Sequence, residues 1–119
     1  MTTQEIAEKL VAYCREGKYD ECYAELYAPN CRSIEPEATG FPVAEGMEAM
    51  AEKGKQWNDN IQEFHGGSVG DPIVVNGYFS CTMDYDCTFK DRGRQKMSQI
   101  CVYKVDDGKI TEERFFYPA

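Results

Sequence analysis

The sequence has few of the features that mark a metal site, a membrane protein or a nucleic-acid-binding protein. Its 119 residues include one histidine, no Cys-x-x-Cys pair and no Cys/His spacing that fits zinc. No apolar run approaches the roughly 20 residues that a membrane-spanning helix needs. Basic residues number 13 against 21 acidic ones, so the net charge is −8, with no Lys/Arg-rich stripe to offset it. We therefore expect no metal, cofactor, membrane or nucleic-acid partner.

A secretory signal is also missing, because charged residues come early in MTTQEIAEKL and no apolar segment precedes a cleavage site. We therefore expect a cytoplasmic protein with reduced thiols, although an even number of cysteines would also permit disulfides. Those in strand-like stretches are expected to pack as small hydrophobic residues. The six cysteines are Cys14, Cys22, Cys31, Cys81, Cys87 and Cys101.

What the sequence does contain is a series of helical patterns followed by strand patterns. Apolar spacing predicts helices over about 3–16, 20–28 and 47–60. A short strand over 31–35 and a Pro- and Gly-rich loop over 36–46 are expected before the third helix. Alternation then predicts strands over about 61–69, 73–89, 97–105 and 109–117. Helices grouped against an antiparallel sheet make an α+β fold, and we expect one domain over 1–119.

The clearest pattern lies in the last quarter of the chain. Two alternating runs flank Asp107-Gly108, which predicts a hairpin because glycine readily takes the positive φ that the turn requires. On the second run, Glu113 shares a face with Phe115 and Tyr117. If this face is enclosed, a carboxylate lies inside the protein, which suggests a pocket.

The order of these segments and several short motifs resemble the nuclear transport factor 2-like superfamily, and within it the SnoaL-like group. The motifs are Gly17–Asp20, Glu25–Asn30, Ser33–Pro36, Gly46–Met50 and Val102–Ile110, which together span nearly the whole chain. The resemblance implies a cone-shaped fold, in which three N-terminal helices pack on a curved, mainly antiparallel sheet that encloses a pocket. Such folds host isomerases, cyclases, hydrolases and plain binding domains, so the fold alone does not assign the reaction.

Ketosteroid isomerases of the superfamily have the same order of elements but a different set of catalytic residues. Glu35 stands where they place an aspartate base, and Tyr13 lies closer to the next glycine than their helix-one tyrosine does. Their late-strand acid would fall at Cys101. We therefore do not predict steroid isomerase activity.

Three titratable residues are candidates for catalysis. An enclosed Glu113 would have a raised pKa and could act as a general acid or base, or it could be a structural carboxylate satisfied by neighbouring hydroxyls. Glu35 is expected at the rim of the cavity, or else in water at a strand end. His65 is the only side chain that titrates near neutral pH unperturbed, but a lone histidine at a strand start is more often structural.

We expect a small-molecule ligand in this pocket, with acid–base chemistry on a small enolisable carbonyl compound as the possible activity. Glu113 or Glu35 would move the proton, while Gln99, Tyr117 or His65 would polarise the oxygen. The alternative is a non-catalytic binding or dimerisation domain. The expected pocket-lining residues are Tyr13, Trp57, Phe79, Met83, Tyr85, Gln99, Cys101, Phe115 and Tyr117.

The opposite face of the sheet is expected to form a homodimer. Ile100 and Val102 lie on that face, and two exposed β-branched apolar side chains favour burial against a second copy. Asp84 and Asp86 share the face and would oppose it unless a cation pairs with them.

Overall fold

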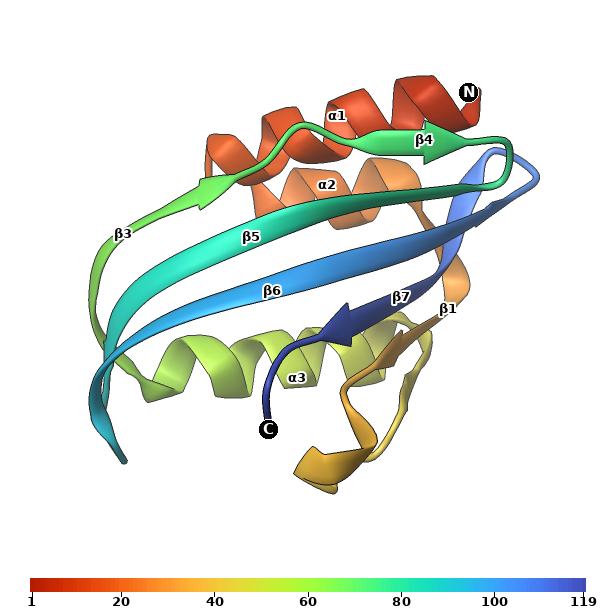
Figure 1. The fold of residues 1–119 in the computed structure, drawn as a ribbon. Coiled ribbons are helices and arrows are strands. Elements are labelled where there is room, and N and C mark those ends of the chain that lie inside the picture. Colours follow the sequence, from red (N-terminus) through yellow and green to blue (C-terminus); the bar gives the residue numbers. More distant parts are fainter.

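The structure, a computed structural model, describes all 119 residues as three α-helices and a curved seven-stranded sheet (Figure 1). The helices are α1 (Thr3–Arg15), α2 (Tyr19–Leu26) and α3 (Gly46–Asn60), with a short 3-10 helix at Glu37–Thr39. The strands are β1 (Tyr27–Ile34), β2 (Ala44–Glu45), β3 (Ile61–Val69), β4 (Ile73–Val75), β5 (Tyr78–Phe89), β6 (Gly93–Asp106) and β7 (Lys109–Phe116). None of the three α-helices has the length and hydropathy needed to cross a bilayer.

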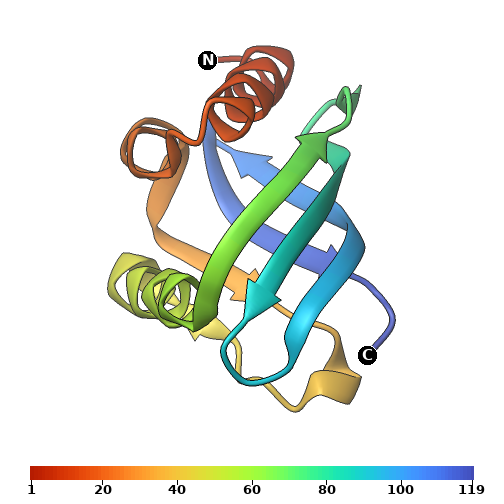
Figure 2. The same ribbon diagram turned by 90° about the vertical axis from the view of Figure 1, so that its left-hand side faces the viewer.

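The sheet has the order β2-β1-β7-β6-β5-β3. Strand β4 is not part of this sequence of neighbours and pairs with β5. All neighbouring strands are antiparallel except β1 and β7, which run parallel. Figure 2 shows the helices gathered on one side of the curved sheet. This confirms the predicted α+β fold, in which helices cover the inner face of a mainly antiparallel sheet.

The first helix starts and packs as its sequence indicates. The Thr2 hydroxyl accepts a hydrogen bond from the Glu5 amide at 3.1 Å, and the Glu5 carboxylate accepts one from the Thr2 amide at 3.0 Å. This capping box satisfies two amides that would otherwise lack partners. One face of α1 then enters the core through Ile6 and Leu10, both of which are fully buried.

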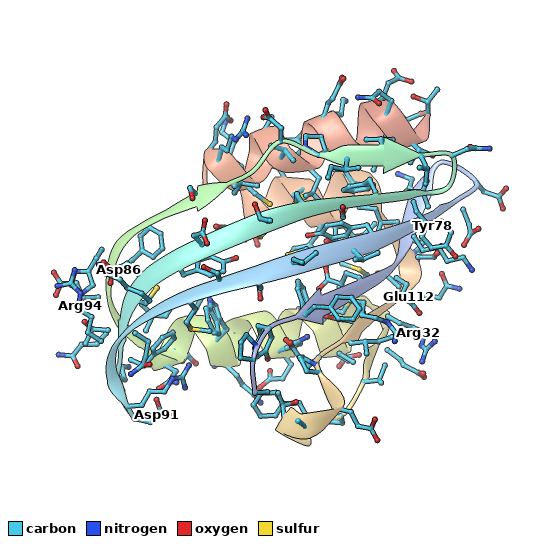
Figure 3. All side chains as sticks on the ribbon, in the orientation of Figure 1. Arg32, Tyr78, Asp86, Asp91, Arg94 and Glu112 are labelled. Carbon is cyan, nitrogen blue, oxygen red and sulfur yellow. The ribbon has the colours of Figure 1, made fainter.

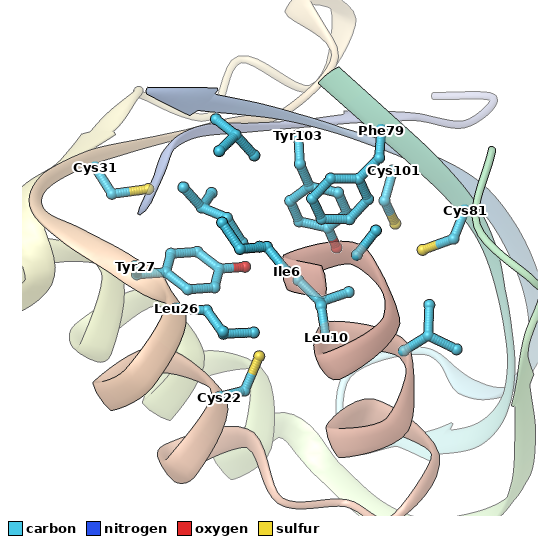
Figure 4. Close-up of a cluster of buried hydrophobic side chains, with 14 of the residues drawn as sticks. Ile6, Leu10, Cys22, Leu26, Tyr27, Cys31, Phe79, Cys81, Cys101 and Tyr103 are labelled. Carbon is cyan, nitrogen blue, oxygen red and sulfur yellow. The ribbon is translucent and has the colours of Figure 1, made fainter. Parts of the chain in front are cut away.

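The core lies between α1, α2 and the inner faces of β5 and β6 (Figure 4). Phe79 on β5 stacks on Tyr103 on β6, with ring centroids 4.6 Å apart and planes 19° apart. Along β5 the buried residues alternate with residues on the outer face, so Cys81, Met83 and Cys87 point inward. The alternation predicted for this strand is therefore present, and all six cysteines are unpaired.

Two element boundaries differ from the sequence-based expectation. The segment over 73–89 is a hairpin rather than one strand, because Gly77, with φ of 89°, turns the chain between β4 and β5. Strand β1 starts at Tyr27 and includes Pro29, where we expected the second helix to end. The register of β1 against β7 shifts between Tyr27 and Arg32, so Pro29 lies in a stretch where its missing amide hydrogen breaks no ladder bond.

Candidate functional site

A buried carboxylate lies where β1 and β7 run side by side. This carboxylate belongs to Glu113, which is only 4% exposed. Its Oε1 accepts a hydrogen bond from the Tyr27 hydroxyl at 2.5 Å, and its Oε2 accepts one from the Ser33 hydroxyl at 2.7 Å. Ser33 and Glu113 are direct partners in the parallel ladder, so their side chains leave the sheet on the same face.

The hydrogen bonds continue from this carboxylate toward the surface. Lys53 Nζ donates to Ser33 Oγ at 2.7 Å and pairs with Glu35 Oε1 at 2.9 Å. The Tyr117 hydroxyl donates to Glu35 Oε2 at 2.9 Å. We call this set the interior polar chain; in order it comprises Tyr27, Glu113, Ser33, Lys53, Glu35 and Tyr117.

Distant parts of the sequence supply the interior polar chain. Ser33 lies near the end of β1, and Glu35 directly follows the last residue of that strand. Lys53 comes from the inner side of α3 and lies over the ring of Phe115, with its Nζ 5.1 Å from the ring centroid. The ammonium group of Lys53 therefore connects α3 to both β1 and β7.

Burial and hydrogen bonding act against each other on Glu113. Burial raises the pKa of this carboxyl above its ordinary value of 4.5, while hydrogen bonds from Tyr27 and Ser33 and the charge of Lys53 partly oppose that rise. Burial, and then the hydrogen bond to Glu35, raises the pKa of the Tyr117 phenol to about 12. The side chain of Glu35 is 13% exposed and that of Lys53 is 30% exposed. The interior polar chain therefore runs from the buried Glu113 to a rim that is partly exposed to solvent.

The raised pKa of Glu113 predicts a pH dependence of stability. Above pH 4.5 the unfolded chain loses this proton first, so the free energy of unfolding should fall as pH rises until the folded carboxyl also ionises. Glu113→Gln removes the titrating group and should flatten this fall. Urea unfolding of both proteins between about pH 4 and 8 measures the difference. Parallel curves for the two proteins would contradict the prediction.

A surface groove of about 300 Å³ lies apart from the residues of the interior polar chain, between the α1–α2 turn and strands β3 and β5. Tyr19, Phe64 and Tyr85 provide its aromatic walls. Its polar residues are already engaged: Asp84 accepts hydrogen bonds from Ser68 at 3.1 Å and from a serine on β6. The groove therefore offers mainly aromatic surface, without an unpaired acid or base.

The structure places the predicted site residues in several different environments. Phe79, Met83 and Cys101 are core residues with at most 5% exposure, and Tyr85 is the predicted pocket residue that borders the groove. His65 Nε2 lies 2.7 Å from Thr88 Oγ1 on the outer side of the sheet, away from the interior polar chain.

The remaining predicted residues lie around these features. The Tyr13 hydroxyl donates to Glu25 at 2.9 Å, and Trp57 packs edge-on against the ring of Tyr85, 5.9 Å between centroids. Gln99 is half-buried and pairs with Met83, so it faces inward. Of the whole predicted set, Glu113, Glu35, Tyr117 and Phe115 are brought together.

Lys53, Ser33 and Tyr27 belong to the interior polar chain but were not predicted as site residues. A signal for Lys53 existed, because it lies three residues after Met50 and four before Trp57, on the apolar side of the third helix. A cation on that side should have indicated a buried acid nearby. The structure brings together no group of three or more His, Cys, Asp or Glu side chains suited to a metal ion.

Comparison with known proteins relates the whole chain to one family. Residues 1–117 match the model of the SnoaL-like domain. A solved structure from Mesorhizobium loti, described as a SnoaL-like polyketide cyclase [carbohydrate phosphatase], is 34% identical, with a TM-score of 0.89 over 98% of this chain and 100% of that one. No curated protein matches the chain.

More distant structures share the fold. A nuclear transport factor 2-like protein of unknown function from Burkholderia pseudomallei is 11% identical, with a TM-score of 0.79 over 98% of this chain and 90% of that one. TerC, co-crystallised with polyporic acid, is 14% identical, with a TM-score of 0.74 over 98% and 91% of the two chains. The family match over 117 residues and the close structural relative show that this chain belongs to the SnoaL-like domain family of the nuclear transport factor 2-like superfamily.

Proposed function

We propose that this chain binds a small carbonyl compound at the rim of the interior polar chain and catalyses proton transfer at the carbon next to the carbonyl. The observation that carries this proposal is the path from the buried Glu113 to the part-exposed Glu35, which runs through hydrogen bonds to Ser33 and Lys53 and ends in the Lys53–Glu35 ion pair. Acid–base chemistry needs a proton carrier and a donor aimed at the same substrate. Glu35, Lys53 and Tyr117 meet at one place and supply both.

Each rim residue has a distinct role in this proposal. Glu35 takes the proton from carbon, because it is more exposed than Glu113 and only one hydroxyl and one ammonium hold it. Lys53 Nζ turns from Ser33 toward the substrate oxygen and stabilises the negative charge that develops there. Glu113 lies behind Glu35 and Lys53, and its charge acts on Lys53 through the hydrogen bonds of Ser33.

Two similar proteins support a small organic ligand. The relative from Mesorhizobium loti is described as a polyketide cyclase, and TerC was crystallised with polyporic acid. Both descriptions concern carbon-based ligands.

The location of this protein in the cytoplasm remains a prediction.

Hydrogen–deuterium exchange tests the proposed chemistry without knowledge of the natural substrate. A panel of enolisable ketones is incubated with the protein in deuterated buffer, and loss of the signal from the hydrogens beside the carbonyl is followed by proton NMR. We expect exchange that saturates with ketone concentration and exceeds exchange caused by an equal concentration of acetate. Exchange at the acetate rate across the whole panel would contradict the proposal.

A non-catalytic binding domain is the second candidate. Its support is that each oxygen of Glu113 and of Glu35 already has a partner within the chain, as in a purely structural network. This candidate predicts a ligand-induced rise in melting temperature for some compounds of the same panel, but no exchange above the acetate rate.

We also predict a homodimer formed through the outer face of the sheet. Ile100 and Phe116 are direct cross-strand partners on this face, and both are 50% exposed. Of the two acidic residues there, Asp86 is paired with Arg94 at 2.8 Å, and Asp84 accepts hydrogen bonds from two serines. Figure 3 shows Arg94 beside Asp86 at one end of the molecule and Arg32 beside Glu112 at the other.

Light scattering at micromolar concentration measures this association. The unchanged protein should have the mass of a dimer, and Ile100→Lys should give a monomer because a buried, unpaired ammonium is costly. Phe41→Lys is the matched control, since Phe41 is 65% exposed in the loop before β2. A dimer that persists in Ile100→Lys would rule out this face.

A further inference from the structure

Two of the core thiols form a pair across the centre of the sheet. Cys81 on β5 and Cys101 on β6 are direct partners in the antiparallel ladder, and both side chains point into the core. In Figure 4 their sulfur atoms point toward each other. Neither thiol belongs to the interior polar chain, and packing alone does not require two cysteines to face each other.

The ladder geometry permits a bond between these two sulfurs. Directly paired residues in antiparallel strands have Cα atoms about 4.5 or 5.5 Å apart. Disulfides join residues whose Cα atoms are roughly 4.4–6.8 Å apart. A disulfide would therefore form here with small side-chain rotations and without separating the strands.

We propose that Cys81 and Cys101 are a redox modification site, at which hydrogen peroxide converts the two thiols to a reversible disulfide between β5 and β6. Cys81 is the thiol that reacts first. It retains 4% exposure whereas Cys101 has none, and hydrogen peroxide is a small, uncharged oxidant.

The electrostatic surroundings support this order of reaction. The adjoining Cys101 thiol, acting as a hydrogen-bond donor, lowers the pKa of the Cys81 thiol, and the positive charge of Arg15 lowers it further. Hydrogen bonding with Cys81, together with burial, raises the pKa of Cys101. The reactive form of cysteine is the thiolate, so attack on peroxide is favoured at Cys81.

The chemistry balances with peroxide as the only oxidant. The Cys81 thiolate attacks one oxygen and breaks the O–O bond, which gives a sulfenic acid and a hydroxide that takes up a proton to become water. The sulfur of Cys101 then displaces the sulfenic hydroxyl as a second water, and the S–S bond forms. Overall, two thiols lose two hydrogen atoms and one peroxide is reduced to two waters.

The other cysteines are less well placed for the same reaction. Cys87 is also buried on β5, but its ladder partner is Gln95, so no thiol lies opposite it. Cys14 and Cys22 lie on α1 and α2, where hydrogen bonding with Cys14 and burial raise the pKa of Cys22. No ladder fixes the separation of these helical thiols.

Peptide mapping after oxidation tests the proposal. The reduced, intact protein is treated with hydrogen peroxide, quenched with catalase, denatured, alkylated with iodoacetamide and digested with trypsin. We expect the peptide over 56–90 to be joined to the peptide over 97–104, while the other four of the six cysteines are alkylated. Dithiothreitol should separate the two peptides.

Matched variants assign the bond to its two sulfurs. Cys87→Ser should retain the linkage, because it leaves Cys81 as the one cysteine of the peptide over 56–90. Cys81→Ser and Cys101→Ser should each abolish it, with circular dichroism showing that each variant is folded. If either fails to fold, the result for Cys87→Ser still decides the assignment.

Three outcomes would overturn the proposal. One is that all six cysteines remain alkylatable after a peroxide treatment that fully oxidises free cysteine. Another is a linkage that disappears in Cys87→Ser, which would place the bond at Cys87. The third is that the oxidised pair is Cys14 and Cys22.

Discussion

Glu35→Gln should lower ketone exchange by about 100- to 10,000-fold, the loss that follows when a positioned general base is removed. Glutamine keeps the size of the side chain and can still accept a hydrogen bond from Tyr117. It cannot take a proton from carbon, and it no longer forms the 2.9 Å ion pair with Lys53. The loss should appear in kcat, with a smaller change in KM, because the amide still fills the same space. Proton NMR of the exchanging ketone measures both quantities.

Two further variants interpret this result. Glu37→Gln is the matched control, because it removes an exposed carboxylate two residues away that makes no contact with the interior polar chain. It should leave exchange unchanged. Glu113→Gln should reduce exchange less than Glu35→Gln does, since Glu113 acts from behind the rim. Full activity in Glu35→Gln would remove Glu35 from the catalytic role.

Phe79→Ala should destabilise the fold by about 3–5 kcal/mol, the range found for removing a fully buried aromatic side chain. Phe79 is 2% exposed, and its ring stacks on Tyr103 with 4.6 Å between centroids. Its removal leaves a cavity in the middle of the core and takes away the stacking partner of Tyr103. Urea unfolding at pH 7 measures the loss as a lower transition midpoint.

Phe41→Ala is the control for this effect. Phe41 is 65% exposed, so the same chemical change there should alter the free energy of unfolding by no more than about 0.5 kcal/mol. Equal destabilisation by both variants would show that burial does not account for the contribution of Phe79.

Much of the fold could be predicted because its signals are local. The Asp107-Gly108 turn takes positive φ at both residues, 50° and 74°, as a tight hairpin turn requires. Alternation along β5 follows from the two-residue repeat of a strand, so its buried face was evident without knowledge of its partners. The same repeat correctly placed Glu113 on a buried face with Phe115.

The Asn76-Gly77 turn carries a local signal that competes with the strand alternation around it. Asn-Gly between apolar runs is itself a hairpin signal, and Gly77 adopts φ of 89° between β4 and β5. Continuous alternation across this segment favoured one long strand. The boundary of β1 is a different case, because Pro29 is compatible with a strand only through the register shift against β7.

Local patterns in the sequence were enough to predict the α+β class and to place Glu113 on the same face as Phe115 and Tyr117. The burial of that carboxylate and the identity of its hydrogen-bond partners became known from the folded structure. Ser33 lies 80 residues before Glu113 and reaches it because β1 and β7 pair in parallel, and Lys53 reaches both from α3. Strand alternation specifies a side chain's face, but contacts across this separation depend on strand order and register, which no local repeat encodes.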